Sequence, residues 1–492
     1  RRIGAGVGKQ RMTERETGNG KNMREFDSVI IGSGQAAPSL AVGLARRGET
    51  VALVEGDRLG GTCVNTGCTP TKTLRKSARI AHLARRAADF GVTTGPVEVD
   101  FPAAMARMRT RVVTARDGLT AWLAGTERLS VIHGWGRFDG READGRLRVM
   151  VGDQILLARQ VYLNTGTRPF LPPVPGIDTI TPLDNAGLLA LTERPDHLIV
   201  VGGSYIGLEL GQILRRLGST VTILHRADRL AEREDADVSG IIADIMRAEE
   251  IDLRLNAGLA SVGKSMRGVL AVLEDGTELS GSHILFATGR VPNTDALNLA
   301  SVGLAADQRG YIATDARLKT NVPGIWALGD INRRGAFTHT AYHDHEIVLA
   351  HRDGLTGLHQ WQGADARVTT YAMFTDPPLG RVGLTRAEAL ALVAQGRRIL
   401  ISDLPMERVS RAKEEGETTG LIRLIVDAET EQFLGATVFG FAGDEIIATL
   451  TNFMATGASY RIMQQALPVH PTVAEFLPTI LAGLKPLGAT DG

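Results

Sequence analysis

The two cysteines of the chain, Cys63 and Cys68, stand five positions apart in the stretch GTCVNTGCTPTK, residues 61–72. Thiols this close can form a structural disulfide or act as a reactive redox pair. On a regular α-helix, Cα atoms at this spacing lie roughly 8–9 Å apart, beyond the ~7 Å limit for a disulfide. A bridge therefore requires non-helical or distorted backbone, which Asn65 and Gly67 can supply.

The residues after Cys68 favour the reactive alternative. Thr69 and Pro70 are typical of the N-cap and first position of a helix, so Cys68 is expected just ahead of a helix N-terminus. The positive end of a helix favours a thiolate and lowers a thiol pKa that begins near ~8.5. Lys72, about one turn further on, can add positive charge.

The composition narrows the classes of function. The 492 residues carry 55 Lys+Arg against 55 Asp+Glu, so no global field favours nucleic acid or an anionic membrane as a partner. No run approaches the ~18 apolar residues of a spanning helix. With two cysteines we expect a cytoplasmic protein rather than a disulfide-rich secreted one. A zinc site lacks two further ligands at the usual spacings, so no metal is predicted.

The first nucleotide-binding pattern lies near the N-terminus. An apolar strand is expected at 26–31 and a second at 50–54, with a helix between them. The turn after the first strand has the form Gly-x-Gly-x-x-Ala: Gly32, Gly34 and Ala37. Such glycines let the backbone approach a pyrophosphate at a helix N-terminus, and the acid that ends the second strand, Glu55, can bind a ribose. With all parts in order, a dinucleotide site is predicted.

The arrangement recurs at the strands expected at 197–201 and 219–224. Its turn residues are Gly202, Gly203, Tyr205 and Gly207. The second strand ends not in an acid but in a basic segment that contains Arg226 and Arg229. A charge-assisted hydrogen bond to a 2′-phosphate is worth ~1.5–3 kcal/mol, so NADPH is expected over NADH. The alternative, that both arginines are merely solvated, stays open. Two dinucleotide sites in one chain imply electron transfer between two cofactors.

Glycines after strands and a change of sequence pattern indicate where one domain ends and the next begins. Gly166 and Gly289 each follow an apolar strand, as expected where the chain leaves a nucleotide domain, and Asp330 can hold a cofactor polyol. From about Arg367 the pattern changes to alternating strands followed by helices. We predict an α/β protein with two Rossmann-like FAD- and NAD(P)-binding domains and a C-terminal α+β dimerisation domain. The expected boundaries are a disordered extension at 1–23, an FAD-binding and central domain at 24–168 and 291–366, an NAD(P)H-binding domain at 169–290 and a dimerisation domain at 367–492.

These motifs together resemble those of the class I pyridine nucleotide–disulfide oxidoreductases, the flavoprotein disulfide reductases. The likeness runs from about residue 23 to about 487. The segments GGTCVNTGCTPTKTL, VVGGSYIGLEL, FTDPPLGRVGLT and HPTVAEFLPT look most like the mercuric-reductase-like branch. The resemblance implies a homodimeric enzyme in which NAD(P)H reduces FAD, FAD reduces the disulfide, and the dithiol reduces a substrate.

The resemblance also implies residue roles. Cys68 would face the flavin as a charge-transfer thiolate, and Cys63 would face the substrate. Lys72 and Glu209 match the ion pair beside flavin N5, although a solvated lysine and a surface acid are the bland alternatives. Tyr205 resembles the aromatic that shields the flavin until nicotinamide displaces it, with core packing as its rival. Gly61 and Thr62, in the redox motif, would also bind the cofactor.

His470 and Glu475 lie near the C-terminus. Thr472-x-x-Glu475 is a capping box, which by itself accounts for Glu475. The match to the His-Pro-Thr-x-x-Glu motif of the family implies that His470 is the acid–base for the partner subunit's active site and that Glu475 orients it. The active site would then be shared between the two subunits of a homodimer.

The substrate is predicted only by class: a small disulfide, an oxidant or a metal ion. Mercuric reductases carry a second cysteine pair near the C-terminus, which this chain lacks, so efficient mercuric ion reduction is not expected. Arg75, Lys76 and Arg79 could form an electropositive entrance for an anion or a solvated helix face. Dihydrolipoamide dehydrogenase is the alternative enzyme. A non-catalytic flavoprotein that binds a partner is the alternative of another class, and an oxidase indifferent to both cysteines is a third.

Overall fold

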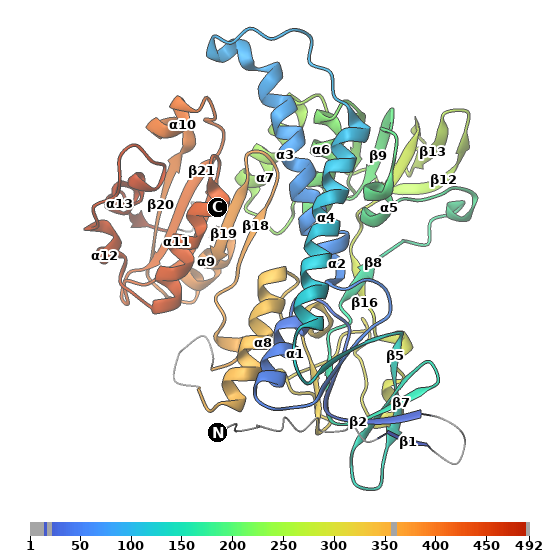
Figure 1. Ribbon diagram of the computed structural model, residues 1–492. Helices are drawn as coiled ribbons and strands as arrows, with labels where there is room; N and C mark the ends of the chain where they lie inside the picture. Colours follow the sequence, from blue (N-terminus) through green and yellow to red (C-terminus); the bar gives the residue numbers. More distant parts are fainter. Residues whose placement is uncertain (1–13, 17–21, 356–361, 489–492) are drawn as a thin grey trace, which may run out of the picture. The chain divides into compact units, whose positions relative to one another are not determined.

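The computed structural model describes residues 14–16, 22–355 and 362–488 (Figure 1). The chain divides into two compact units, each built from several segments. Unit 1 takes its residues from Arg1–Asn65, Val113–Arg168 and Val291–Ala366. Unit 2 takes its residues from Thr66–Val112, Pro169–Arg290 and Arg367–Gly492. The division into FAD-binding, NAD(P)H-binding and dimerisation domains with the boundaries given above stays a prediction.

Unit 1 is built on one sheet of order β4-β3-β2-β7-β6-β5, in which β1 also pairs with β2 and β17 with β7. The strands are β1 Glu14–Glu16, β2 Asn22–Ile31, β3 Val51–Glu55, β4 Leu129–His133, β5 Gly136–Arg141, β6 Leu147–Val151, β7 Gln154–Leu163 and β17 Ile325–Ala327. The helices are α1 Ala37–Arg46, α2 Gly61–Asn65 and α8 Thr338–Arg352, with 3₁₀ turns η3 Asp295–Leu297, η4 Leu299–Val302, η5 Gly329–Asn332 and η7 Ala364–Ala366. Of the predicted N-terminal extension, 1–13 and 17–21 lie outside the described residues.

The first part of unit 2 has a parallel sheet of order β11-β10-β9-β15 and an antiparallel sheet of order β12-β13-β14. The strands are β9 His197–Val201, β10 Thr220–Leu224, β11 Asp252–Arg254, β12 Leu259–Ser265, β13 Gly268–Leu273, β14 Glu278–Gly281 and β15 His283–Phe286. The helices are α3 Cys68–Arg85, α5 Asn185–Ala190, α6 Tyr205–Arg216 and α7 Ala236–Ala248, with η1 Ala87–Phe90 and η2 Ile177–Thr179. Helix α4, Phe101–Ala124, continues across the boundary between the units, and β8 Thr167–Pro169 pairs with β16 Arg290–Pro292.

The C-terminal part of unit 2 is a six-stranded sheet of order β18-β19-β22-β21-β20-β23 with helices. The strands are β18 Thr370–Met373, β19 Leu379–Gly383, β20 Ile399–Pro405, β21 Leu421–Asp427, β22 Phe433–Phe439 and β23 Lys485–Pro486. The helices are α9 Arg386–Ala394, α10 Ser410–Glu414, α11 Gly443–Thr456, α12 Tyr460–Gln464 and α13 Leu477–Ala482, with η8 Met406–Arg408 and η9 Ala474–Phe476. The predicted α/β fold class with two βαβ units and a C-terminal α+β part is confirmed. Among the described residues no helix is long and apolar enough to cross a membrane.

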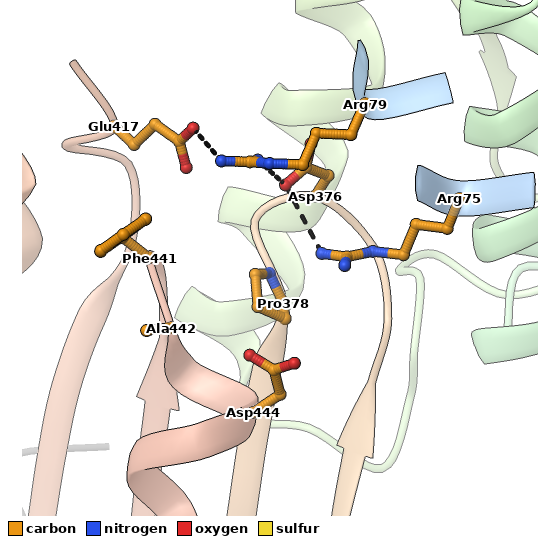
Figure 2. A pocket seen from close by; sticks show the side chains of 8 residues that line it. All are labelled: Arg75, Arg79, Asp376, Pro378, Glu417, Phe441, Ala442 and Asp444. Carbon is orange, nitrogen blue, oxygen red and sulfur yellow. Dashed lines mark hydrogen bonds and ion pairs between the residues drawn. The ribbon is translucent and has the colours of Figure 1, made fainter. Parts of the chain in front are cut away.

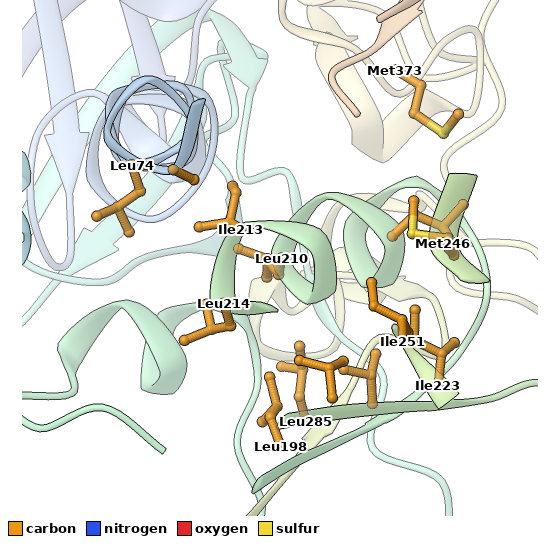
Figure 3. Close-up of a cluster of buried hydrophobic side chains, with 14 of the residues drawn as sticks. Leu74, Leu198, Leu210, Ile213, Leu214, Ile223, Met246, Ile251, Leu285 and Met373 are labelled. Carbon is orange, nitrogen blue, oxygen red and sulfur yellow. The ribbon is translucent and has the colours of Figure 1, made fainter. Parts of the chain in front are cut away.

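A cluster of buried apolar side chains in unit 2 fixes helix α3 relative to α6. Leu74 on α3 and Leu210, Ile213 and Leu214 on α6 are all buried within it, and strands β9, β10 and β15 contribute further members (Figure 3). Burying one leucine or isoleucine side chain contributes about 1.5–3 kcal/mol, so these contacts hold the two helices firmly. Lys72 is the fifth residue of α3 and Glu209 the fifth residue of α6, so both are thereby placed on rigid elements.

Candidate active site

The first glycine loop, in unit 1, is closed by Asn164. Gly32 has a φ of +92°, and a Cβ there would lie 2.4 Å from the Asn164 carbonyl oxygen, so no side chain fits. A Cβ at Gly34 would lie 2.8 Å from Asn164 Oδ1. That same Oδ1 accepts the amide of Ala37 at 3.3 Å, and Asn164 Nδ2 donates to the Leu328 carbonyl at 2.8 Å. The loop is thus a close-packed cradle at the start of α1, which fits a dinucleotide pyrophosphate.

Glu55 is fixed at the end of β3 beside this loop. Its Oε2 accepts the amide of Ser33 at 2.9 Å and the Ser33 hydroxyl at 2.5 Å, and its Oε1 accepts the Asp57 amide at 2.8 Å. The redox segment begins against the same loop, because a Cβ at Gly61 would lie 3.0 Å from Gly34 Cα. An acid, a glycine cradle and the start of the redox segment therefore meet within unit 1.

The other predicted cofactor residues of unit 1 lie at its chain crossings. Asp330 is part of η5, and its Oδ2 accepts the Thr167 hydroxyl at 3.3 Å. Gly166 directly precedes Thr167 and has a φ of +62°. Gly289, in unit 2, has a φ of +126°. Thr62 lies in α2 and is exposed.

The second glycine loop, in unit 2, repeats the first. Gly202 has a φ of +120°, and a Cβ there would lie 2.4 Å from the Ala287 carbonyl oxygen. At Gly207 a Cβ would lie 2.0 Å from the Gly202 carbonyl oxygen, so α6 can start directly on the loop only because both residues are glycine. The amide of Gly203 donates to His225 Nδ1 at 3.2 Å. The loop therefore fits a second dinucleotide.

The residues after β10 point to the choice of nucleotide. His225 stands at the position of the expected acid, with its Nε2 3.2 Å from a Glu232 carboxylate oxygen. Arg226 and Arg229 are both exposed, and Arg229 Nη2 donates to the Glu232 carbonyl at 3.2 Å. Arg226 makes no hydrogen bond or ion pair with any residue that the structure describes. Tyr205, the first residue of α6, is half-buried and packs partly against the apolar cluster that contains Leu210.

Lys72 and Glu209 form an ion pair within unit 2. Lys72 Nζ lies 2.7 Å from Glu209 Oε2, and Glu209 Oε1 accepts the amide of Phe374 at 2.8 Å. Glu209 is 4% exposed, so it is not a surface acid. Lys72 Nζ also lies 4.4 Å from the centroid of the Phe374 ring, within the range of a cation–π contact. A buried carboxylate requires such partners, and both of its oxygens have one.

The segment that carries Phe374 is itself held on α6. Gln212 Oε1 accepts the amide of Asp376 at 2.8 Å, and Gln212 Nε2 donates to the Asp376 carbonyl at 2.9 Å. Arg216 pairs with the Asp376 carboxylate. Burial alone would raise the pKa of Asp376, but the guanidinium groups of Arg216 and Arg79 hold that pKa below its ordinary value. The position of Phe374 relative to Glu209 is therefore fixed by a buried polar network.

Two expectations for the basic residues of α3 are corrected by this network. Arg75 Nη2 donates to the Thr375 carbonyl at 2.8 Å and lies 3.5 Å from Asp376 Oδ1. Arg79 pairs with Asp376 and Glu417 (Figure 2). Both arginine side chains are only 20% and 19% exposed, so they are not a solvated face, whereas Lys76 is exposed. They line a cavity of about 150 Å³ together with Asp376, Pro378, Glu417, Phe441, Ala442 and Asp444. Three carboxylates against two guanidinium groups do not make an electropositive entrance.

The two cysteines lie on either side of a break in the helical backbone. Cys63 is in α2, Cys68 is the first residue of α3, and both are half-buried. The predicted cap at Thr69 is wrong, because the N-cap of α3 is Gly67, with φ −127° and ψ −112°. Pro70 is therefore the third helical residue, where it removes no intrahelical hydrogen bond. Cys68 lies on the helix N-terminus itself, and the required departure from helix falls at Gly67 and the residue before it.

His470 and Glu475 form a hydrogen-bonded pair in the C-terminal part of unit 2. His470 Nδ1 lies 2.9 Å from Glu475 Oε2, while the His470 side chain is 77% exposed. The Thr472 hydroxyl accepts the Glu475 amide at 3.2 Å, which is one half of the predicted capping box. In the other half of a capping box the Glu475 carboxylate would accept the Thr472 amide, but here it contacts His470. The helical segment begins as the 3₁₀ turn η9. The arrangement orients the ring and leaves Nε2 on the exposed side.

Sequence reasoning missed two residues of the site. Asn164 closes the first glycine loop, and its signal was its place directly after a strand in Asn-Thr-Gly. Phe374 meets both members of the ion pair, yet its place in FTDPPLG carries no sign of that contact, since more than 160 residues separate it from Glu209.

Comparison with known proteins extends over nearly the whole chain. The family "Pyridine nucleotide-disulphide oxidoreductase" matches residues 26–344, and the dimerisation domain of the same family matches 369–480. The "Probable pyridine nucleotide-disulfide oxidoreductase RclA" of Escherichia coli is 34% identical over 94% of this chain and 100% of its own length. A mercuric reductase of Streptomyces lividans is 34% identical over 92% and 94%, and a dihydrolipoyl dehydrogenase of Cupriavidus necator 31% over 92% and 97%.

The fold agrees with a solved relative. The HOCl-induced flavoprotein disulfide reductase RclA from E. coli superposes with a TM-score of 0.82, covering 93% of this chain and 99% of that one at 34% identity. Its Cu(II) complex gives a TM-score of 0.83 over 94% and 100%.

Proposed function

The chain belongs to the pyridine nucleotide–disulphide oxidoreductases, a flavin- and pyridine-nucleotide-dependent family, and from that premise we propose its reaction. We propose that it passes electrons from NADPH through FAD to a Cys63–Cys68 disulfide and on to a small disulfide, oxidant or metal ion. The observation that carries the proposal is the Lys72–Glu209 pair: Lys72 lies one turn beyond Cys68, and Glu209 lies on the helix that starts at the second glycine loop. This ion pair therefore joins the helix that begins at Cys68 to the helix that begins at the proposed nucleotide-binding loop.

The two glycine cradles are the proposed binding sites of the two cofactors. Gly32, Gly34, Glu55 and Asp330 would hold FAD in unit 1, with Ala37, Gly61, Thr62 and Gly166 around them. Gly202, Gly203, Gly207 and Gly289 would hold NADPH in unit 2, with Tyr205 beside them. Bound FAD would supply a carrier that takes a hydride from a nicotinamide and delivers an electron pair to a disulfide. Lys72, held by Glu209, would keep a fixed positive charge where negative charge develops.

The cysteines and His470 would carry the second half of the reaction. Two electrons and one proton convert the disulfide into the Cys68 thiolate, stabilised at the N-terminus of α3, and the Cys63 thiol. His470 of the partner subunit would take the proton of the Cys63 thiol, and the Cys63 thiolate would attack one sulfur of a disulfide substrate and break its S–S bond. This step forms a mixed disulfide and releases a thiolate, which would take the proton back from His470 of the partner subunit. The Cys68 thiolate would then attack the Cys63 sulfur, restore the Cys63–Cys68 disulfide and release the second product as a thiolate, which takes a proton from solvent.

A homodimer is part of the proposal. The matched dimerisation domain supports it, as do three exposed large apolar side chains in the eight residues before His470, those of Ile462, Leu467 and Val469. Glu475 holds His470 Nδ1, so Nε2 is the atom that would exchange the proton.

The sequence also supports a choice of nucleotide, of substrate class and of location. His225 in place of an acid, with Arg226 unpaired among the described residues, supports NADPH and argues against a dihydrolipoamide dehydrogenase that uses NAD. Both cysteines of the 492 residues belong to the redox motif, so no second pair is present to pass on a mercuric ion. The low cysteine content also supports a cytoplasmic location.

Anaerobic titration of the purified holoprotein with NADPH tests the proposal. We expect a long-wavelength absorbance band at the two-electron stage, where the Cys68 thiolate lies against oxidised flavin. Cys68→Ser should abolish the band, whereas Cys63→Ser should show it without any reductant, because Cys68 then stays a thiolate. A wild-type protein without the band at any stage would refute the thiol relay.

A further inference from the structure

Glu234, which lies between β10 and α7, is buried although it is an acid. It is 7% exposed, and residues 226–230, shortly before it, include the two arginines expected to bind a 2′-phosphate. Arg381 Nη1, on β19, donates to Glu234 Oε2 at 2.8 Å, and the hydroxyl of Tyr371, on β18, donates to Glu234 Oε1. Burial and the neighbouring Glu234 carboxylate raise the pKa of Tyr371, so its hydroxyl stays protonated and remains a donor. Both carboxylate oxygens of Glu234 are therefore bound by strands of the C-terminal sheet.

Arg381, the ion-pair partner of Glu234, is equally removed from water. It is 1% exposed, and among the residues that the structure describes Glu234 is the one carboxylate with which it pairs. Burying two opposite charges is costly, and apolar side chains of similar volume would often stabilise a fold as well or better. Because two different strands bind the two oxygens, however, the Glu234 carboxylate has one defined position, and the backbone next to it is held accordingly.

Backbone hydrogen bonds connect Glu234 with the second glycine loop. The Glu234 amide donates to the Ala231 carbonyl at 2.7 Å, and the Ala231 amide donates to the Gly203 carbonyl at 2.9 Å. Ala231 has a φ of +46°, in the left-handed region that residues other than glycine rarely adopt. Such a conformation persists only where the surrounding structure enforces it. The anchored Glu234 on one side and Gly203 on the other supply this constraint.

Residues 226–230 are held at their other end as well. His225 Nδ1 accepts the Gly203 amide at 3.2 Å, so the residue before the segment is fixed to the same loop. The exposed Arg226 and Arg229 lie between these two fixed points. The positions of their guanidinium groups therefore depend on the anchors at both ends of the segment.

We propose that Arg381 is a positioning residue for the choice of nucleotide: by holding Glu234, it keeps residues 226–230 where their arginines meet the 2′-phosphate of NADPH. The inference rests on the proposed use of NADPH. The glycine loop itself is shaped by the close contacts of its own glycines, so the parts that NADPH and NADH share do not depend on Arg381. Loss of Arg381 should therefore weaken the binding of NADPH and not that of NADH.

Anaerobic stopped-flow reduction of the holoprotein by each nucleotide tests this role, because it needs no electron acceptor. Arg381→Met should raise the apparent Kd for NADPH roughly tenfold and leave the limiting rate of flavin reduction unchanged. The apparent Kd for NADH should stay within about twofold of the wild type. Arg381→Lys, which keeps the positive charge, should retain most of the affinity for NADPH. An equal loss for both nucleotides, or no loss for either, would overturn the proposal.

Two further variants separate positioning from stability. Glu234→Gln removes the charge of the other member of the pair and should show the same selective loss of NADPH affinity; its result decides the question if Arg381→Met does not fold. The matched control is Arg397→Met, since Arg397 pairs with the buried Asp427 of the same sheet. This control should lower the melting temperature and leave both apparent Kd values within about twofold of the wild type.

Arg226→Ala distinguishes a failure of this inference from a failure of the proposed NADPH preference. If Arg226→Ala weakens NADPH binding selectively and Arg381→Met does not, the preference stands and the positioning role is refuted. If the wild type binds NADH as tightly as NADPH, the preference itself fails, and the positioning role fails with it.

Discussion

At the scale of single residues, the Lys72–Glu209 pair is costly to keep. Glu209 is 4% exposed, and removing a carboxylate from water costs several kcal/mol that Lys72 and the Phe374 amide must offset. Apolar residues of similar volume would often stabilise a fold as well or better. The pair is therefore better explained by a charge that has to be held in one place than by stability, which agrees with its proposed role beside the flavin.

The choice between the two nicotinamide nucleotides also belongs to single residues. Replacing Arg226 with Ala should lower kcat/KM for NADPH roughly ten- to hundredfold, because a charge-assisted hydrogen bond to the 2′-phosphate is lost. The value for NADH should stay unchanged, since NADH has no phosphate there. Steady-state kinetics with both nucleotides measures the two changes.

A matched control for this experiment is Arg247→Ala. Arg247 is an exposed arginine of the same unit, on α7, and among the residues that the structure describes it pairs with Asp244 alone. It should leave both kcat/KM values within about twofold of the wild type. Equal losses for NADPH and NADH in Arg226→Ala would mean that Arg226 does not read the phosphate, and the solvated-arginine interpretation would hold.

At the scale of elements, the segment after β18 ties the C-terminal sheet to helices α3 and α6 of the same unit. The Asp376 carboxylate forms ion pairs with Arg216 of α6 and Arg79 of α3. The side-chain amide of Gln212, also on α6, forms hydrogen bonds with both the backbone amide and the backbone carbonyl of Asp376. Phe374 belongs to the same segment, so the position of its ring under Lys72 depends on these bonds. Loss of the Asp376 charge should therefore affect both stability and the ion pair.

Asp376→Asn tests this network through its pH dependence. At pH 7 it should lower the free energy of unfolding by about 3 kcal/mol, because the buried Arg216 and Arg79 lose a counter-charge. The pKa of Asp376 is depressed in the folded state, so its contribution is complete above the unfolded value of ~3.9 and declines as the pH falls below it. Thermal melts of both proteins should thus differ by a constant amount from pH 7 down to about 4, and should converge only as the pH is lowered further below ~3.9.

The control for Asp376→Asn lines the same cavity. Asp444 forms no ion pair with any residue in the described part of the chain, so Asp444→Asn should leave the melting temperature nearly unchanged at either pH. A difference between Asp376→Asn and the wild type that stays equally large below pH ~3.9 would contradict the assignment of the stability to the Asp376 charge.

The sequence predicted the helices and strands better than it predicted the contacts between side chains from distant segments. Both βαβ units follow from glycine spacing and strand patterns, because a loop that must close on a neighbouring backbone, as Gly32 does on Asn164, tolerates no other residue. The start of α3 was missed by two residues, since Pro70 is equally acceptable at the first and third helical positions. Arg75 and Arg79 were misjudged because their partners come from segments about 300 residues away, which no local pattern shows.

At the scale of the whole molecule, the chemistry is spread over segments far apart in the sequence. The redox motif begins in unit 1 and continues in unit 2, with the boundary between Asn65 and Thr66. His470 lies in the part of the chain that matches the dimerisation domain of the family, and its exposed side chain has Nδ1 held by Glu475. A histidine that is oriented by a carboxylate and yet exposed in a single chain agrees with the proposed active site shared between two subunits.

Complementation between two inactive variants tests that sharing. In Cys63→Ser each active site lacks its substrate-facing thiol, and in His470→Ala each lacks its acid–base, so each homodimer should be nearly inactive. If His470 serves the partner subunit, a heterodimer of the two variants joins intact cysteines from one chain with an intact histidine from the other at one of its two sites. Random reassociation makes half of the dimers mixed, so about a quarter of the wild-type activity should return.

This recovery is measured by assaying disulfide reduction before and after the two variants are unfolded and refolded as a mixture. Glu475→Gln, which keeps a side-chain oxygen near His470 Nδ1 but removes the charge, should complement Cys63→Ser at least as well as His470→Ala does. If heterodimers are present and no mixture recovers activity, His470 either acts at the active site of its own subunit or takes no part in the reaction.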